Sequence, residues 1–190
     1  NNTDDRLSRI AVYADRIYGV GSTIESDLEA IAVVAFTLNG IPENGFSQDG
    51  KRFHHISPGG DVATSLVIQP DLKIVVAGYT GFSFEKDFCI VRFNPDGTLD
   101  NSFSGDGIFV PDVGPTHDRA FGVALQSDQK IIVAGTSYVE TGDDFALIRL
   151  LTNGAIDVDF GDDGYTIAPI GPFFDDARDM ILQPDDKILI

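Results

Sequence analysis

The sequence predicts an all-β protein, a β-propeller-type array of four-stranded antiparallel blades. Two observations support this fold class. Equivalent residues recur every 57 positions along the chain, and each unit contains four short apolar segments separated by turn-forming residues. The chain of 190 residues therefore holds about 3.3 such repeats.

The 57-residue period appears in several residue types, and no gap is needed to follow it. The series are Phe46, Phe103 and Phe160; Gln69, Gln126 and Gln183; Lys73, Lys130 and Lys187; Gly21, Gly78 and Gly135; Gly40, Gly97 and Gly154; and Asp4, Asp61, Asp118 and Asp175. Delimited by the phenylalanines, the chain divides into a partial and atypical unit 1 (1–46), unit 2 (47–103), unit 3 (104–160) and a truncated unit 4 (161–190).

Each unit is expected to form four strands. In unit 2 the first three span 62–69, 73–78 and 87–93, and the fourth strand of a unit follows a dipeptide such as Asp106-Gly107. The second strand is a continuous apolar run, which indicates a strand covered on both faces. A parallel β-solenoid is the main alternative, but its coils are usually shorter and lack repeated hairpin signals.

Two pairs of glycines are expected to be structurally equivalent. Gly78 and Gly135 are predicted at the exit of the second strand, and Gly97 and Gly154 in tight turns. The expected core consists of apolar residues of the two central strands: Ile74, Val76, Ile90, Ile131, Val133, Leu147 and Ile148.

Three units and a remnant do not predict a closed ring. A blade cannot cover both faces of its own sheet, and propellers typically close with about four to eight blades. The segment 187–190 aligns with only the first half of the second strand. We therefore expect further blades, from a longer polypeptide or from another chain, to complete the ring.

The repeat resembles a known family. The pattern D-x-A…Q-x-D-x-K-I-x-V-A-G…D-F-x-x-x-R…G-x-x-D…F-x-x-D-G runs through units 2 and 3 almost unchanged, and it resembles the delta-60 repeat family of bacterial proteins. The resemblance implies a propeller-like array in secreted or surface-associated proteins, and hence an extracellular or cell-surface location. The family carries no catalytic residues that would transfer to this chain.

Unit 1 departs from the pattern at three positions. Ala30 stands where the other units have Asp87 and Asp144, Ala35 stands where they have Arg92 and Arg149, and Arg6 replaces a repeated alanine. The joint loss of Asp and Arg predicts that Asp87, Arg92, Asp144 and Arg149 belong to one structural polar network. Asp87 and Arg92 are five residues apart on one strand, so they point to opposite faces and need partners elsewhere.

Acidic loops suggest calcium as the candidate cofactor. Asp157, Asp159, Asp162 and Asp163 lie within one short segment, and Asn94, Asp96, Asp100 and Asp106 form a sparser version. Calcium takes six to eight oxygen ligands, which such loops can supply. The alternative is that these Asp and Asn residues only form turns.

Other residues have a structural and a functional interpretation. Cys89 lies in an apolar run, which favours a buried structural thiol over a nucleophile. His54, His55 and His117 would be metal ligands if the fold brings them together, and otherwise exposed polar residues. The aromatic residues of the connections are expected either to be covered by a neighbouring blade or to form a contact patch: Phe82, Phe84, Phe173 and Phe174.

Composition excludes one class of partner. The chain has 13 Lys and Arg residues against 30 Asp and Glu residues, and a net charge of −17, whereas nucleic-acid binding needs a basic surface. No apolar stretch approaches the length of a membrane span, and the motifs GxSxG, HExxH, CxxC and the P-loop are absent.

These observations predict a non-enzymatic binding or scaffold module that contacts a protein or glycan ligand through propeller loops. No catalytic residue is assigned. The alternatives are a propeller enzyme, such as a lyase or hydrolase with a site in the central channel, and a purely structural spacer or shell component.

Overall fold

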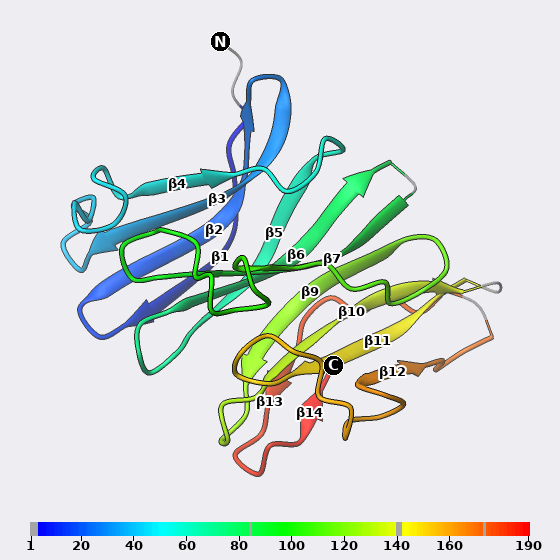
Figure 1. Cartoon of the computed structure of the whole chain (residues 1–190). Helices are drawn as coiled ribbons and strands as arrows, with labels where there is room; N and C mark the ends of the chain where they lie inside the picture. The colour runs from blue at the N-terminus through cyan, green and yellow to red at the C-terminus, as the bar shows by residue number, and fades with distance from the viewer. Residues whose placement is uncertain (1–3, 84, 140–141, 173) are drawn as a thin grey trace.

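The computed structural model describes residues 4–83, 85–139, 142–172 and 174–190. It consists of three four-stranded antiparallel sheets followed by a two-stranded one (Figure 1). The predicted fold class is confirmed: each four-stranded sheet is one propeller blade. In the described part of the chain, no helix has the length and apolar character needed to cross a membrane.

We number the sheets as blades 1 to 4 along the chain. Blade 1 contains β1 (Arg6–Tyr13), β2 (Arg16–Glu25), β3 (Leu28–Thr37) and β4 (Lys51–His54). Blade 2 contains β5 (Asp61–Ile68), β6 (Ile74–Phe82), β7 (Glu85–Phe93) and β8 (Ile108–Phe109). Blade 3 contains β9 (Asp118–Leu125), β10 (Ile131–Val139), β11 (Gly142–Leu150) and β12 (Tyr165–Ala168), and blade 4 contains β13 (Ile181–Leu182) and β14 (Ile188–Leu189).

Within each complete blade the strands lie in sequence order, and each pairs antiparallel with the next. The first strands β1, β5 and β9 face one another at the centre of the array, and the fourth strands lie outside (Figure 1). The connections 55–60 and 110–117 lead from the outer strand of one blade to the inner strand of the next. Each sequence unit therefore begins with the outer strand of the preceding blade.

The repeated glycines have two different roles. Gly97 and Gly154 occupy turns with φ of 84° and 85°, which confirms the prediction for this pair. The prediction that Gly78 and Gly135 end the second strand is wrong, because β6 and β10 continue past them. Both lie beside a bulge of the inner strand, and a Cβ on Gly78 would lie 1.9 Å from the Val62 carbonyl oxygen.

The 57-residue spacing fails in one strand. It would place Arg6 opposite Gly21, as Ala63 is opposite Gly78, but the structure pairs Leu7 with Gly21. Each residue of β1 therefore has a number one higher than the 57-residue repeat assigns to its place in the blade. Consequently Asp5, not Asp4, occupies the place of Asp61.

The core lies between blades. One apolar cluster joins blades 1 and 2, a second joins blades 2 and 3, and a smaller third joins blades 3 and 4. Six of the seven residues predicted as core are fully buried, and Leu147 is 7% exposed, so this prediction is confirmed. Cys89 is fully buried as well, and burial raises the pKa of its thiol.

One face of blade 1 is uncovered, because the sheets do not close into a ring. Leu7, Ile10 and Val12 of β1 are 66%, 59% and 63% exposed. Their counterparts Ala63, Leu66 and Ile68 are buried against the preceding blade. Across the centre of the array, Arg9 donates two hydrogen bonds of 2.9 and 3.0 Å to the carboxylate of Asp179, which precedes β13.

The burial pattern gives a stability prediction. Ile131→Ala removes a fully buried side chain from the second cluster and should lower the free energy of unfolding by about 2–5 kcal/mol. Val158→Ala, at a 63% exposed site, should change it by less than about 0.5 kcal/mol. Urea unfolding of both variants measures the difference, and equal midpoints would contradict the burial of Ile131.

Candidate functional site

The most regular polar feature is an ion pair at the end of the third strand of blades 2 and 3. In blade 2, Arg92 Nε lies 2.7 Å from Asp100 Oδ2, and Lys73 Nζ lies 3.0 Å from the same oxygen. Burial opposes ionisation of Asp100, but hydrogen bonds from Ser102 and Lys73 and the charge of Arg92 outweigh it and hold the pKa well below its usual value. Asp100 is therefore a buried carboxylate whose charge is matched internally.

Arg92 also joins blade 2 to blade 3. Its guanidinium donates to the backbone carbonyl of Thr152 in the next blade and, at 3.1 Å, to Ser102 Oγ. The guanidinium carbon lies 4.7 Å from the centre of the Phe103 ring. With only 4% of its surface exposed, Arg92 acts as a clamp between the two blades.

Blade 3 repeats the ion pair. Arg149 Nε lies 2.6 Å and Lys130 Nζ 2.9 Å from Asp157 Oδ2, and Arg149 stacks on Phe160. The hydrogen bond from Lys130, together with the hydrogen bond and the charge of Arg149, lowers the pKa of Asp157 despite burial. The Arg149 side chain is 18% exposed against 5% for Arg92, because no turn of a following blade covers it among the described residues.

Blade 1 keeps a reduced form of this arrangement. Glu43 occupies the place of Asp100, and Arg16 Nε, in the place of Lys73, lies 3.4 Å from its carboxylate. Ala35 stands where the clamping arginine would be and is fully buried. The ion pair is thus retained without the contact to the next blade.

A turn and an aromatic ring complete each junction. Ser47 donates its backbone N–H to the carbonyl of Asp96 in blade 2 at 2.8 Å, and Ser104 donates in the same way to Asn153 at 2.9 Å. Phe103 is fully buried, and a Cβ on Gly154 would lie 2.8 Å from its ring. The glycine is needed both for the turn and for the approach of the ring.

The four residues predicted as one polar network fall into two places. Arg92 and Arg149 belong to the two ion-pair groups, with Asp100 and Asp157 as partners. Asp87 and Asp144 lie towards the opposite ends of β7 and β11, opposite Thr80 and Ser137. The missed partner was visible in the sequence as the Asp of G-x-x-D, eight positions after each arginine.

The acidic loop predicted to bind calcium is partly used for structure. Asp157 is 4% exposed and accepts from Arg149, Lys130 and the backbone N–H of Asp159. Asp159, Asp162 and Asp163 are exposed. Calcium binding by this loop stays a prediction, and it would compete with two cations for Asp157.

A different acidic group comes together at the junction of blades 2 and 3. One carboxylate oxygen each of Asp87, Asp112 and Asp118 lies within 4.8 Å of the others. Asp87 belongs to β7, Asp112 to the connection between the blades, and Asp118 begins β9. Burial and the charges of the other two carboxylates raise the pKa of Asp87.

The histidines do not gather. His55 Nε2 lies 3.3 Å from Glu25 in blade 1, whereas His117 Nε2 lies 3.4 Å from Asp143 in blade 3. Across the residues that the structure describes, no histidine belongs to a group of three potential metal ligands. His117 also stacks on Tyr138, with ring centres 4.9 Å apart.

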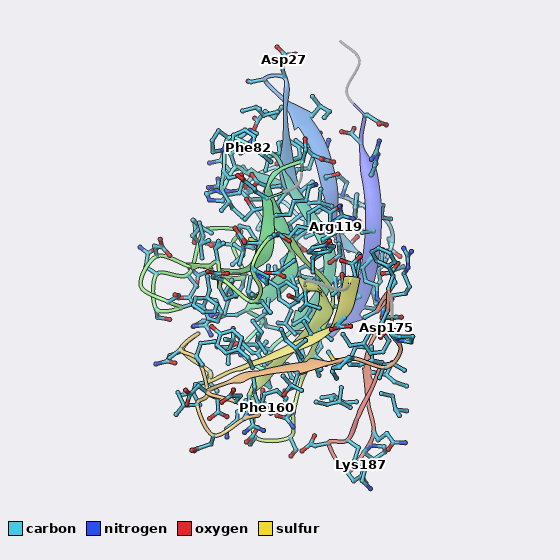
Figure 2. All side chains as sticks on the ribbon, turned by 90° about the vertical axis from the view of Figure 1, so that its right-hand side faces the viewer. Asp27, Phe82, Arg119, Phe160, Asp175 and Lys187 are labelled. Atoms are coloured by element: carbon cyan, nitrogen blue, oxygen red, sulfur yellow. The ribbon has the colours of Figure 1, made fainter. Side chains whose placement is uncertain are left out.

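The aromatic residues of the connections are exposed where the structure describes them. Phe82 is 56% and Phe174 is 71% exposed, whereas Phe84 and Phe173 lie outside the described residues. Figure 2 shows Phe82 far from Asp175, the neighbour of Phe174 in sequence. Phe82 and Phe174 therefore do not form one patch.

Comparison with known proteins supports the repeat. Residues 69–103 and 126–160 match the family described as a domain of unknown function (DUF5122), beta-propeller. These two segments are similar to the repeat of that β-propeller family. They begin 57 positions apart, and each runs from the end of a first strand through the second and third strands to the phenylalanine under the next turn. No curated protein matches the chain.

The DUF5122 match covers part of the prediction that the chain resembles the delta-60 repeat family. It confirms a β-propeller repeat in units 2 and 3, in the same residues that suggested the delta-60 repeat. Membership in the delta-60 repeat family itself stays a prediction.

The clamps predict a dependence of stability on acid. A carboxylate whose pKa is lowered in the folded protein stabilises it above the unfolded pKa of about 4, and this stabilisation is lost as the pH falls below that value. The free energy of unfolding should therefore decrease between about pH 5 and pH 2.

Asp100→Asn tests the origin of this dependence. The variant leaves buried Arg92 without its carboxylate, so it should lose about 3–5 kcal/mol at pH 7 and show a flatter pH profile. The exposed Asp163→Asn serves as a control that keeps the wild-type profile. Urea unfolding from about pH 7 to pH 3 measures all three proteins, and parallel profiles would exclude Asp100 as a source.

Proposed function

We propose that this chain is a non-enzymatic binding or scaffold module of a secreted or surface-associated bacterial protein. It would contact a protein or glycan through the connections at the ends of the blades. The fold holds such connections on rigid sheets, which is how loops acquire a defined binding geometry.

Our main reason is that the repeated charged residues form ion pairs with one another. Arg92, Lys73 and Asp100 form a closed ion-pair group, as do Arg149, Lys130 and Asp157. Lys73 and Lys130 also lie 3.7 Å from Asp71 and Asp128, so every cation of the two groups has a carboxylate partner. Arg92 in addition joins blade 2 to blade 3. Residues without repeat equivalents, such as Phe82, His117 and Asp112, lie in the hairpins and connections instead.

The histidines favour binding over a lyase or hydrolase. A propeller enzyme would bring unique acids and histidines to one pocket, whereas His55 and His117 pair with acids of different blades. The cleft of about 470 Å³ beside the blade 2 clamp is lined by Lys73, Arg92 and Gln69 among others, and its two cations are paired with Asp100.

We also propose that a further blade of the same repeat, from the same polypeptide, covers the exposed face of blade 1. Leu7, Ile10 and Val12 present the side chains that their counterparts bury at the next junction. A blade packing there would extend an interface type already seen twice in this structure.

The binding proposal can be tested with the purified protein on glycan and extracellular-protein arrays. Phe82→Ala, at an exposed hairpin, should weaken binding to the identified ligand by roughly tenfold or more without changing the Tm. Val158→Ala, exposed in a loop of blade 3, is the matched control. Absence of any ligand, or turnover of the bound glycan, would overturn the proposal.

The blade 1 proposal predicts behaviour of the 190-residue chain by itself. Its uncovered apolar face should bind the dye ANS or cause self-association, because exposed strands with apolar faces associate. Ile10→Glu should reduce both effects, and Val158→Glu should not. A monomer that binds no dye would show that this face needs no cover.

A further inference from the structure

Three of the four copies of one repeated aspartate follow a connection between blades, and their surroundings differ. Asp61, Asp118 and Asp175 are equivalent, and each accepts backbone N–H groups from the connection that precedes it. Asp61 receives hydrogen bonds from Ile56 and Ser57, and from Thr80 across the strands. Both of its oxygens are therefore satisfied.

Asp118 is satisfied on one side only. Its Oδ2 accepts the N–H of Gly114 at 2.8 Å, whereas its Oδ1 is buried and accepts no hydrogen bond of regular geometry, with only the Ser137 hydroxyl beside it; the residue is fully inaccessible. Ser137, opposite it on β10, is also fully buried, and its hydroxyl has no partner of regular hydrogen-bond geometry either. A buried, unpartnered oxygen is costly unless a further group binds there.

These two oxygens both lie close to the backbone of Gly114. A Cβ built on Gly114 would lie 1.9 Å from Ser137 Oγ and 2.8 Å from Asp118 Oδ1, so both atoms border the site of the missing side chain. Burial raises the pKa of Asp118, and the nearby Ser137 hydroxyl offsets only part of this rise. A side chain at position 114 would collide with the Ser137 hydroxyl, so glycine lets the connection pass close to Asp118.

Two more carboxylates stand at the same place. Oxygens of Asp87, Asp112 and Asp118 lie within 4.8 Å of one another, and Asp112 is exposed, so the group opens to solvent. Among the described residues, no lysine, arginine or histidine forms an ion pair with any of the three. Three like charges at this separation repel one another strongly.

The other junctions lack this group. Around Asp61 the equivalent positions hold Ala30 and His55, and around Asp175 they hold Asp144 and Pro169. In the part of the chain that the structure describes, three carboxylates therefore meet only where blade 3 follows blade 2. The repeat does not require them, since the blade 1–blade 2 junction folds in the same way without them.

From this geometry we propose that Asp87, Asp112 and Asp118 bind one Ca²⁺ ion at the junction of blades 2 and 3. Calcium–oxygen distances are about 2.3–2.6 Å, so ligand oxygens around one ion lie up to about 5 Å apart, as these do. Calcium accepts carboxylates from separate segments with water at the open side, whereas Mg²⁺ usually uses one or two carboxylates. The ion would tie the third strand of one blade to the first strand of the next.

Titration of EDTA-treated protein with CaCl₂, followed by calorimetry and thermal unfolding, tests the site. We expect one ion per chain, a Kd of roughly 10⁻⁵ to 10⁻³ M and a higher Tm. Asp112→Asn is the main variant, because its side chain is exposed and can be changed without disturbing the core. It should weaken binding by roughly tenfold or more, since affinity follows ligand charge.

Two controls distinguish this site from calcium binding elsewhere on the protein and from a purely structural effect of the substitution. Asp163→Asn alters the acidic loop of blade 3 and should leave calcium affinity unchanged. In EDTA, Asp112→Asn should raise the Tm, because it removes repulsion from Asp87 and Asp118. The proposal is overturned by no binding at millimolar Ca²⁺, by binding that Asp112→Asn and Asp87→Asn leave intact, by loss of binding in Asp163→Asn, or by a lower Tm of Asp112→Asn in EDTA.

Discussion

The packing of a phenylalanine ring beneath the turn of the next blade is the contact on which the array depends. Phe46 and Phe103 are fully buried, and Gly97 and Gly154 lie directly over them. The same turn accepts a backbone hydrogen bond from the residue after each phenylalanine. Where the clamping arginine is present, it adds a third contact, from Arg92 to the Thr152 carbonyl. Backbone, ring and charge thus fix the position of each blade relative to its predecessor.

This mode of assembly places the core between neighbouring blades. The outer face of a terminal blade is therefore buried only where another blade packs against it. The uncovered face of blade 1 has the same pattern of apolar side chains as the inner junctions, although Leu7, Ile10 and Val12 meet solvent. At the other end Arg149 is more exposed than Arg92 because it contacts no following turn among the described residues. Stability in such an array is approximately a sum over blades and junctions, so each junction can vary without disturbing the others.

The period of the sequence was sufficient to predict the blades, because hydrophobic runs and turns repeat with the same spacing as the strands. It could not predict the bulge beside Gly78 or the one-residue shift of β1, since both depend on how neighbouring strands pair. The density of Asp residues in the acidic loop predicted a calcium site, yet Asp157 forms ion pairs with Lys130 and Arg149. The group of Asp87, Asp112 and Asp118 could not be predicted, because its members come from three segments that only tertiary structure brings together.

The same backbone position therefore carries different chemistry at different junctions. Asp61, Asp118 and Asp175 all accept N–H groups from the preceding connection, which shows that the repeat fixes this carboxylate for a structural reason. The two neighbouring positions are free to change, because Ala30 and His55 at one junction and Asp87 and Asp112 at the next leave the sheets alike. Under our proposal, the specific function of a junction belongs to the non-repeating neighbours of this repeated aspartate. The repeat supplies a carboxylate that holds a loop, and in our proposal the residues beside it determine whether it also binds a metal ion.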